Sequence, residues 1–363
     1  MCGRRWRAVA QQNNDQGVGI LTWMQSISDR LPRWFNGGGG SADNVSIYVS
    51  GSAVACAHAS RPDAEGELVV EMRADPIKQL ADVPEVLAKQ VQSIGRSPGF
   101  DNCNLVLAPE LYNLLLVERP DVADEEVCDA VRWTIQEQVD YPVETATLDT
   151  FDLPSSASRE RPMVYVVSIE TEFLKTMADK VLSVGLKLGS VDIAELALRN
   201  LVWRCFPGAD QSIAMLRLTA NSGMISISRG DELYLSRRVS GVPKVFAEEA
   251  WEEFRERMVL QVQRSIDYYE SAMNQPHCNV LMAACTHGWS KRVCEHLSEM
   301  LAIPIREVVD LIKEEVRLTL HNPDRVEVDW DNLSADEANA IAAGLPAIGG
   351  VLRKHIAEVS EAA

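Results

Sequence analysis

Cysteine and histidine residues toward the end of the sequence are the first candidates for chemistry. Cys278, Cys285, His287, Cys294 and His296 lie close together along the chain, and zinc is often bound by such residues. Their spacings match no common zinc module, and Cys294 and His296 would point to different faces of the helix expected there. We therefore interpret these residues as structural, since a zinc site would need four of them to converge.

A second candidate is the pair Cys56 and His58, which could act as a nucleophile and its base. The two residues alternate along an expected strand and so share one face. No third residue that would orient the imidazole is identifiable, and cysteine is commonly a small buried residue. We favour a core role for the pair, and the sequence predicts no catalytic residue and no metal site.

The charge and composition of the chain limit its partners. Its 35 Lys and Arg against 53 Asp and Glu leave a net charge of −18. A protein surface that binds nucleic acid is basic, so nucleic acid is not an expected partner. Hydrophobic residues make up 46% of the 363 residues, enough for a substantial core.

The eight cysteines include no CxxC pair and are expected to be reduced. No apolar run approaches the roughly 18 residues that span a bilayer, which predicts a cytoplasmic protein.

Residues 1–43 are expected to form an N-terminal extension. A short amphipathic helix is predicted over Met24–Phe35, and the glycine tract Gly37–Gly40 ends it. Met24 would itself be a suitable start of the chain. The helix could dock weakly on a membrane surface or a partner, but we favour a loosely packed terminal helix.

A three-strand unit followed by a helix occurs twice along the chain. The first copy has predicted strands at Val45–Ser50, Ala53–Ala59 and Glu67–Arg73 and a helix from Pro76 to Ile94. The second has strands at Ser212–Thr219, Gly223–Arg229 and Glu232–Val239 and a helix from Pro243 to Ala272. Such a duplication predicts an α/β protein with two related βββα-based halves, the form of the actin and sugar-kinase (ASKHA) superfamily.

Each half also contains further strand–helix units. We expect a first half over residues 44–193, with an inserted subdomain at about 103–170. This subdomain is expected to have a helix from Asp124 to Val139 and strands near Leu105, Leu114, Thr147 and Val166. The second half is expected over 194–356, with C-terminal helices, and residues 357–363 form a tail.

Several segments together resemble the MshI family of mannose-sensitive haemagglutinin pilus biogenesis and, more distantly, PilM of type IV pili and the cytoplasmic part of GspL. The resemblance rests on Leu111–Val122, the helix Ala130–Glu144 with its Tyr141–Pro142–Val143–Glu144 end, Phe151–Pro154, Asp192–Asn200 and Leu233–Arg238. It covers about Asp43 to Arg353.

The resemblance implies a cytoplasmic actin-like protein that is peripheral to the inner membrane. Such a protein docks on the short cytoplasmic tail of a PilN-like bitopic partner and belongs to the platform on which an ATPase motor assembles pilins.

The same resemblance locates a possible nucleotide site at the first turn of each half, where backbone N–H groups cradle phosphate beside an aspartate that positions Mg²⁺. The corresponding positions here are Tyr48, Ser50, Gly51 and Ser52 in the first turn and Arg217 and Thr219 in the second. Neither strand carries a carboxylate near its turn, and the adenine-side glycine pair is replaced by Ala283 and Ala284.

These departures remove the groups that hold Mg²⁺ and orient water in phosphoryl transfer. We therefore expect no cofactor and no hydrolysis, with residual ATP binding through Arg217 left open. The preferred function is a pilus-platform scaffold that binds a PilN-like tail in a groove between the inserted subdomain and the first half. The alternatives are an ATP-binding actin-like ATPase of that platform and a type II secretion platform protein.

Overall fold

The computed structural model of the protein describes residues 45–59, 68–94, 102–158, 161–206, 210–220, 222–244, 247–286, 288–321 and 324–353. The predicted N-terminal extension, with its helix at Met24–Phe35, and the tail from 357 to 363 lie outside these residues. So does His287.

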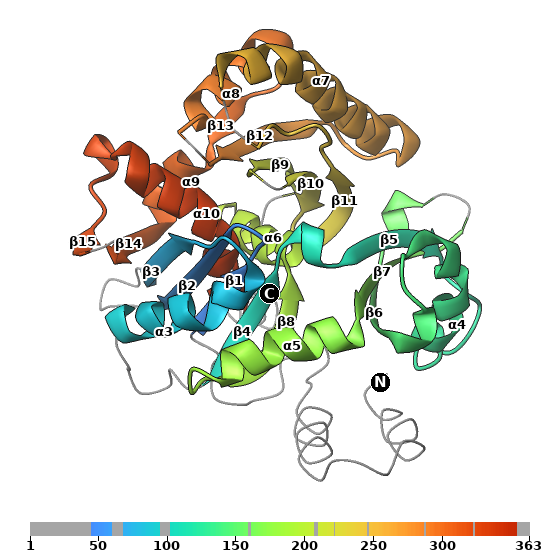
Figure 1. The fold of residues 1–363 in the computed structure, drawn as a ribbon. Coiled ribbons are helices and arrows are strands. Elements are labelled where there is room, and N and C mark those ends of the chain that lie inside the picture. Colours follow the sequence, from blue (N-terminus) through green and yellow to red (C-terminus); the bar gives the residue numbers. More distant parts are fainter. Residues whose placement is uncertain are drawn as a thin grey trace.

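The first half contains a seven-stranded sheet with the strand order β15-β14-β3-β2-β1-β4-β8 (Figure 1). Its N-terminal part is a meander of β1 (Val45–Val49), β2 (Ala53–Ala59) and β3 (Leu68–Pro76), followed by α3 (Val83–Ile94), β4 (Asn102–Leu107) and later β8 (Lys187–Ile193). All five residues of β1 are buried, because the strand lies at the centre of the sheet with helices over both faces. The predicted strands of this meander are confirmed, with β3 three residues longer at its C-terminal end.

The second half repeats this arrangement in a five-stranded sheet of order β11-β10-β9-β12-β13. The strands are β9 (Ser212–Leu218), β10 (Gly223–Arg229), β11 (Glu232–Arg238), β12 (Cys278–Cys285) and β13 (Ile305–Glu307). In both halves the first strand is antiparallel to the second and parallel to the fourth. The order β3-β2-β1-β4-β8 therefore has the same topology as β11-β10-β9-β12-β13, which confirms the duplication expected from the sequence.

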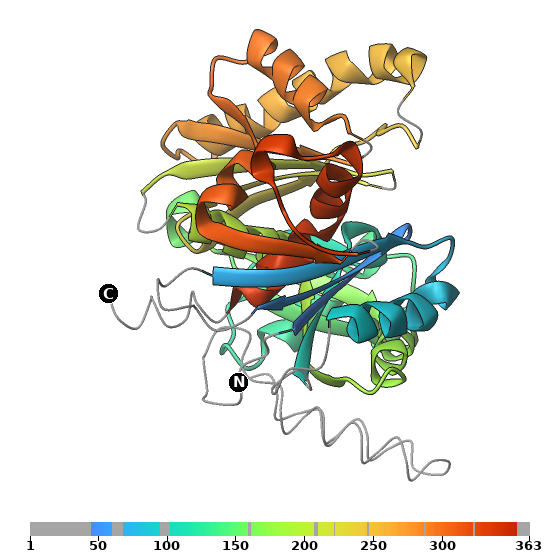
Figure 2. The ribbon, with the colours of Figure 1, turned by 90° about the vertical axis from the view of Figure 1, so that its left-hand side faces the viewer.

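Helices lie on both faces of the two sheets (Figures 1 and 2). Helices α3 and α5 (Thr171–Leu182) cover the outer face of the first sheet, and α7 (Glu248–Asp267) with α8 (Ser290–Met300) covers that of the second. A π-helical turn at Tyr268–Ala272 continues α7. Between the sheets lie α6 (Ala194–Cys205), α9 (Val308–Glu315) and α10 (Ala335–Val351).

A smaller sheet of order β5-β7-β6 forms an inserted unit beside the first half (Figure 1). Its elements are β5 (Asn113–Glu118), α4 (Val127–Thr134), β6 (Ala146–Asp152) and β7 (Met163–Glu170), with short 3-10 turns between them. The predicted helix over Asp124–Val139 is shorter than expected, because its last part is a 3-10 turn at Gln136–Gln138.

The structure corrects two of the expected domain boundaries. The strand near Leu105, assigned to the inserted subdomain, is β4, and it pairs with β1 and β8 at the centre of the main sheet; the insertion therefore follows β4. The second half was expected to keep the chain to residue 356, but β14 (Val316–His321) pairs in parallel with β3 and carries β15 (Arg325–Glu327) into the first sheet. In both cases the pairing of strands that are far apart in the sequence decides to which sheet a segment belongs, and a local residue pattern does not specify that pairing.

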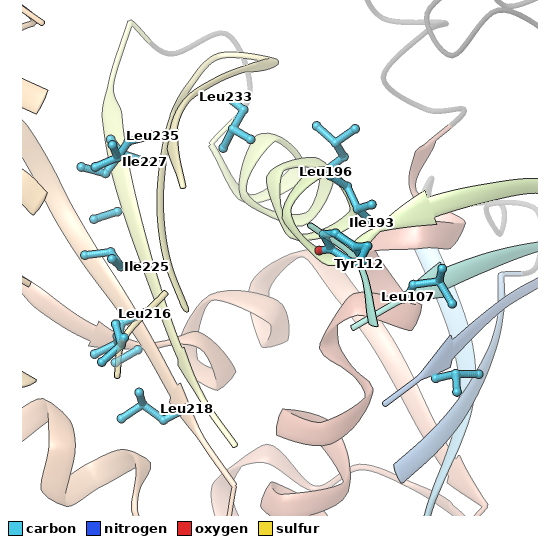
Figure 3. Close-up of a cluster of buried hydrophobic side chains, with 14 of the residues drawn as sticks. Leu107, Tyr112, Ile193, Leu196, Leu216, Leu218, Ile225, Ile227, Leu233 and Leu235 are labelled. Carbon is cyan, nitrogen blue, oxygen red and sulfur yellow. The ribbon is translucent and has the colours of Figure 1, made fainter. Parts of the chain in front are cut away.

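The core is continuous across these units. One cluster of buried side chains runs from the five-stranded sheet to the junction with the first half, and Figure 3 shows part of it, with Leu216, Ile225 and Ile227 on one side and Tyr112 and Ile193 on the other. No helix among the described residues has the length and hydropathy needed to cross a bilayer.

Helix α10 packs closely against α6 and against β1. A Cβ atom on Gly349 would lie 2.0 Å from the backbone oxygen of Ala197 in α6, and one on Gly350 would lie 2.1 Å from Oγ of Ser46 in β1. Glycine is therefore required at both positions, because it allows the helix backbone to touch the sheet and α6 directly.

Candidate functional site

The two turns that the sequence identified lie at the ends of the first strand of each half. Tyr48 and Ser50 belong to β1 and its turn, and Arg217 and Thr219 occupy the corresponding positions of β9 and its turn. All four side chains are buried or nearly so. The structure thus brings the predicted residues of both halves to one place, between the two sheets.

Arg217 and Tyr48 contact each other across the junction of the halves. Nη1 of Arg217 donates a hydrogen bond to the Tyr48 hydroxyl at 3.1 Å, and its Cζ lies 5.1 Å from the centre of the tyrosine ring. Tyr48 is 1% exposed and Arg217 is 4% exposed. Burial raises the pKa of Tyr48, and the neighbouring guanidinium partly offsets that rise, so the tyrosine is a neutral hydroxyl facing a buried cation.

Helix α10 supplies the other acceptors of Arg217. Nε donates to the carbonyl oxygen of Ala342 at 3.3 Å, and Nη2 donates to that of Ala343 at 3.0 Å. Pro346 lies inside this helix and has no N–H, so the carbonyl four residues earlier, that of Ala342, lacks its usual helical donor. The guanidinium of Arg217 satisfies that carbonyl and thereby joins the second half to a helix that packs on the first sheet.

In the first turn, backbone N–H groups are occupied by side chains of the protein itself. The Ser50 hydroxyl accepts from the N–H of Ala53 at 2.9 Å and from that of Ser52 at 3.3 Å, and donates to the Ala53 carbonyl at 3.1 Å. The N–H of Gly51 donates to Oε1 of Glu110 at 3.0 Å. These are the groups that would point at a phosphate in a nucleotide-binding turn.

The second turn is stabilised by the same kind of hydrogen bonds between a hydroxyl side chain and the backbone. The hydroxyl of Thr219 accepts from the N–H of Ser222 at 3.1 Å and donates to the Ser222 carbonyl at 3.0 Å. A short hydroxyl side chain that bonds to the backbone around it stabilises a turn locally. Ser50 and Thr219 are therefore equivalent residues with equivalent roles in the two halves.

The adenine-side positions are part of the core. Ala283 and Ala284 lie near the end of β12. They are 0% and 4% exposed and belong to buried clusters on opposite faces of the sheet. A cavity of about 440 Å³ lies between α8, β13 and α9, and one of about 180 Å³ lies beside β14 and β15. None of the residues predicted for the nucleotide site lines either of these two cavities.

Two contributors to this site were not found from the sequence. Glu110 follows β4 directly, in the 3-10 turn Pro109–Leu111, and its place at the carboxyl end of a parallel strand beside β1 is a position where α/β sheets bind ligands. Pro346 in the middle of an apolar helix was a second available signal, because it frees a carbonyl.

The cysteine and histidine candidates do not converge. No group of three or more His, Cys, Asp or Glu side chains within the described ranges is placed to hold a metal ion. Cys278, Cys285 and Cys294 are buried. Burial raises the pKa of the Cys56 thiol to about 12 and lowers that of His58; both shifts favour the neutral forms, whereas a nucleophile needs the thiolate.

A last feature of the junction is a buried carboxylate between α6 and the second sheet. Glu195 is 3% exposed and accepts hydrogen bonds from the Tyr112 hydroxyl and, at 3.2 Å, from that of Ser236. Arg238 donates to the carbonyls of Pro109 and, at 2.9 Å, Tyr112. Strand β11 of the second half is therefore bonded to the segment that carries Glu110.

Comparison with known proteins identifies the fold. No family model matches the chain, and no curated protein matches it. Among solved structures, the "PilM-PilN type IV pilus biogenesis complex" contains a chain that superposes with a TM-score of 0.67 at 16% identity, over 86% of this chain and 99% of that one. The cytoplasmic domain of EpsL, an inner-membrane component of the type II secretion system of Vibrio cholerae, matches with a TM-score of 0.42 at 12% identity, over 82% and 93% of the two chains. The chain has the actin-like ATPase fold and is similar in structure to PilM.

Proposed function

We propose that this protein is a cytoplasmic scaffold of a type IV-type pilus biogenesis platform, peripheral to the inner membrane, which binds the cytoplasmic tail of a PilN-like membrane protein and hydrolyses no ATP. The observation that carries the proposal is the match to the chain in the PilM–PilN complex, which spans 99% of that chain. Assignment to the mannose-sensitive haemagglutinin type of pilus is a narrower proposal, which rests on the sequence resemblance.

The inserted unit supplies two features that a partner tail could use. Strand β5 is an edge strand of the β5-β7-β6 sheet, and such an edge can accept an extended segment through main-chain hydrogen bonds. Trp133 of α4 is 60% exposed, and a large aromatic side chain of this kind commonly anchors an interface. Both features support a tail-binding groove that involves the inserted unit.

The first experiment is co-purification of the full chain with the cytoplasmic tail of a PilN-like protein from the same organism. Trp133→Ala should weaken tail binding roughly tenfold or more if the tryptophan is an anchor. Leu260→Ala is the matched control, because Leu260 is 48% exposed on the other half and its loss should leave binding unchanged. A tail with N-methylated backbone amides should bind weakly if it adds a strand to β5.

Wild-type protein that retains no tail at micromolar concentrations would contradict the proposed partner. The ATPase alternative has a separate test, in which Mg-ATP is titrated into the protein while heat and released phosphate are followed. ATP hydrolysis by wild-type protein that is faster than hydrolysis by an Arg217→Met variant would mean that the protein is an ATPase and would contradict the scaffold proposal. Neighbouring genes for pilins or for secretion components would distinguish a pilus platform from a type II secretion platform.

A further inference from the structure

The cavity of about 440 Å³ in the second half is walled by α8, by the edge strand β13 and by the start of α9. Figure 1 shows these elements on the opposite side of the molecule from the inserted unit. A volume of this size is typical of sites that hold an organic group, and the tail-binding groove proposed for the inserted unit makes no use of it.

Carboxylates outnumber cations in the lining of this cavity by four to two. Both cations lie close to a carboxylate of the chain. Nζ of Lys291 is 4.0 Å from Oε1 of Glu295, and Nη2 of Arg306 is 4.0 Å from Oε1 of Glu314. The lining therefore carries an excess of negative charge that its own cations do not balance.

Glu307 is half-buried in this lining without a cation beside it. It stands at the N-cap position of α9, but its side chain makes no capping hydrogen bond, and no ion pair joins it to a described residue within 4 Å. Burial and the neighbouring Asp310 both raise the pKa of its carboxyl, as happens where a carboxylate lacks positive charge nearby. A cation in the cavity would stabilise the charged form of Glu307.

Helix α8 carries its charges in the reverse of the order that its dipole favours. Lys291 and Arg292 lie in its first turn, Glu295 and Glu299 lie in its C-terminal half, and its last turn contains no basic residue. Anions normally stabilise the N-terminal end of a helix and cations its C-terminal end, so this order costs stability. A local rule that is broken without a gain within the chain is typical of a functional site.

The chemistry of the lining suits an organic cation better than a metal ion. No group of three or more His, Cys, Asp or Glu side chains in the described part of the chain is placed to hold a metal. Cys294 lines the cavity, but it is 9% exposed and burial raises the pKa of its thiol to about 12, so it stays neutral. Met300, which follows Glu299 at the end of α8, is 50% exposed, and an apolar side chain next to the carboxylates favours a cation that a protein carries.

We propose that the cavity between α8, β13 and α9 binds an arginine side chain of a partner protein. Glu299 and Glu307 accept hydrogen bonds from the guanidinium, whose planar set of donors can serve two carboxylates at once. The net charge of −18 attracts a basic partner over a longer range. The site goes beyond the proposed tail binding because it lies on the other half, which gives the scaffold places for two partners at once.

The test uses the full chain and Nα-acetyl-L-arginine N-methylamide, a probe that carries the arginine side chain between two peptide groups. The probe should bind at millimolar concentrations and shift the amide signals of α8 and β13 in ¹H–¹⁵N spectra. Its citrulline counterpart has nearly the same shape without the charge, and it should bind roughly tenfold more weakly. Glu307→Gln should weaken binding of the arginine probe by a similar factor.

Glu249→Gln is the matched control, because it removes one exposed carboxylate of α7 that does not line the cavity and should leave binding of the probe unchanged. Glu299→Gln, at an exposed position, covers the case in which Glu307→Gln does not fold, and it should also weaken binding. The proposal is overturned if the citrulline probe binds as tightly as the arginine probe, or if Glu249→Gln loses as much affinity as the cavity variants.

Free L-arginine distinguishes the two sources of the same cation. Binding of the free amino acid that is tenfold tighter than binding of the blocked probe would also overturn the proposal, since the cavity would then serve a small molecule and not a partner protein. Glu307→Gln should leave tail binding by the inserted unit unchanged, so a failure to bind the tail would concern the pilus role alone.

Discussion

The contact between Arg217 and Tyr48 should be a measurable link between the two halves. We expect this in a double-mutant cycle of Arg217→Met and Tyr48→Phe, followed by urea unfolding. Phenylalanine keeps the ring beneath the guanidinium and removes only the hydroxyl that accepts at 3.1 Å. Methionine keeps the length and apolar stem of arginine while it removes the charge and every donor.

The magnitude follows from the groups that each change leaves behind. A hydrogen bond to a charged group contributes about 1.5–3 kcal/mol, so Tyr48→Phe should lower the free energy of unfolding by about 1–2 kcal/mol. Arg217→Met removes the donor to the Ala342 carbonyl, and Pro346 cannot replace it because it has no N–H. The same change leaves the Tyr48 hydroxyl without the guanidinium that donates to it. Each unsatisfied buried group costs about 1–3 kcal/mol, but the cost of burying the charge disappears. The net loss should be about 2–4 kcal/mol, and the coupling energy about 1–2 kcal/mol.

The assay compares the free energies of unfolding of the four proteins at pH 7, monitored by circular dichroism. Arg161→Met is the control, because the Arg161 side chain is 69% exposed in its pair with Glu118 and such a change is usually worth less than about 0.5 kcal/mol. The reasoning is refuted if the coupling energy is below about 0.5 kcal/mol, or if Arg217→Met costs no more than Arg161→Met.

Three further predictions concern packing, pH and thiol chemistry. Gly349→Ala should destabilise the protein by about 1–3 kcal/mol, because its Cβ would meet the Ala197 backbone at 2.0 Å, whereas Gly344→Ala meets the flexible end of a methionine and should cost less; thermal melting of the pair checks this. Burial raises the pKa of Glu195 above its usual 4.5, so the stability it contributes is complete below pH 4.5 and is lost as the pH rises through the raised pKa. Glu195→Gln should flatten that decline in the free energy of unfolding above pH 4.5. Since burial raises the pKa of Cys56 to about 12, this thiol should resist a disulfide reagent at pH 8 in the native protein and react at once in urea, and fast native labelling of Cys56 by mass spectrometry would contradict its burial.

The strands of the repeated unit were predictable because their residues carry the pattern themselves. In β3, buried and half-buried residues alternate from Leu68 to Ala74, which is the signal of a strand between two environments. Strand β10 was predicted with its observed bounds, because Asn221–Gly223 and Arg229–Asp231 mark its ends. The residue pattern and the turn residues agree at these strands, so the sequence was sufficient to predict where they lie.

The assignment of strands to sheets was not predictable in the same way. The strand around Leu105 is a short apolar run whose pattern is equally compatible with the inserted unit and the main sheet. Strand β14 was not expected at all; it reaches the first sheet from the far end of the chain, beside β3. Such pairings depend on which segments meet in three dimensions, and a single sequence contains no record of that.

The candidate site was likewise predictable from the sequence only in part. Tyr48 and Arg217 could be identified because the family resemblance assigns a nucleotide-site turn to each half, and the structure places the two residues in contact. Glu110 was not identified, because it lies 59 residues from Gly51, whose N–H it accepts, and because the strand before it was assigned to the inserted subdomain and not to the main sheet. Its carboxylate was also an unexpected partner, since the resemblance placed a phosphate there.

The junction between the two halves is held by hydrogen bonds between groups of the chain itself. Glu110 provides a negative group at Gly51, Arg217 provides a cation, and its bonds to Tyr48 and to α10 join the halves. If the chain hydrolyses no nucleotide, as we propose, its two halves would then need no ligand to stay in register. Control of partner binding would in that case belong to the inserted unit, which bears the open edge of β5 and the exposed Trp133, and Arg217→Met should loosen the halves without changing the affinity of that unit for a tail.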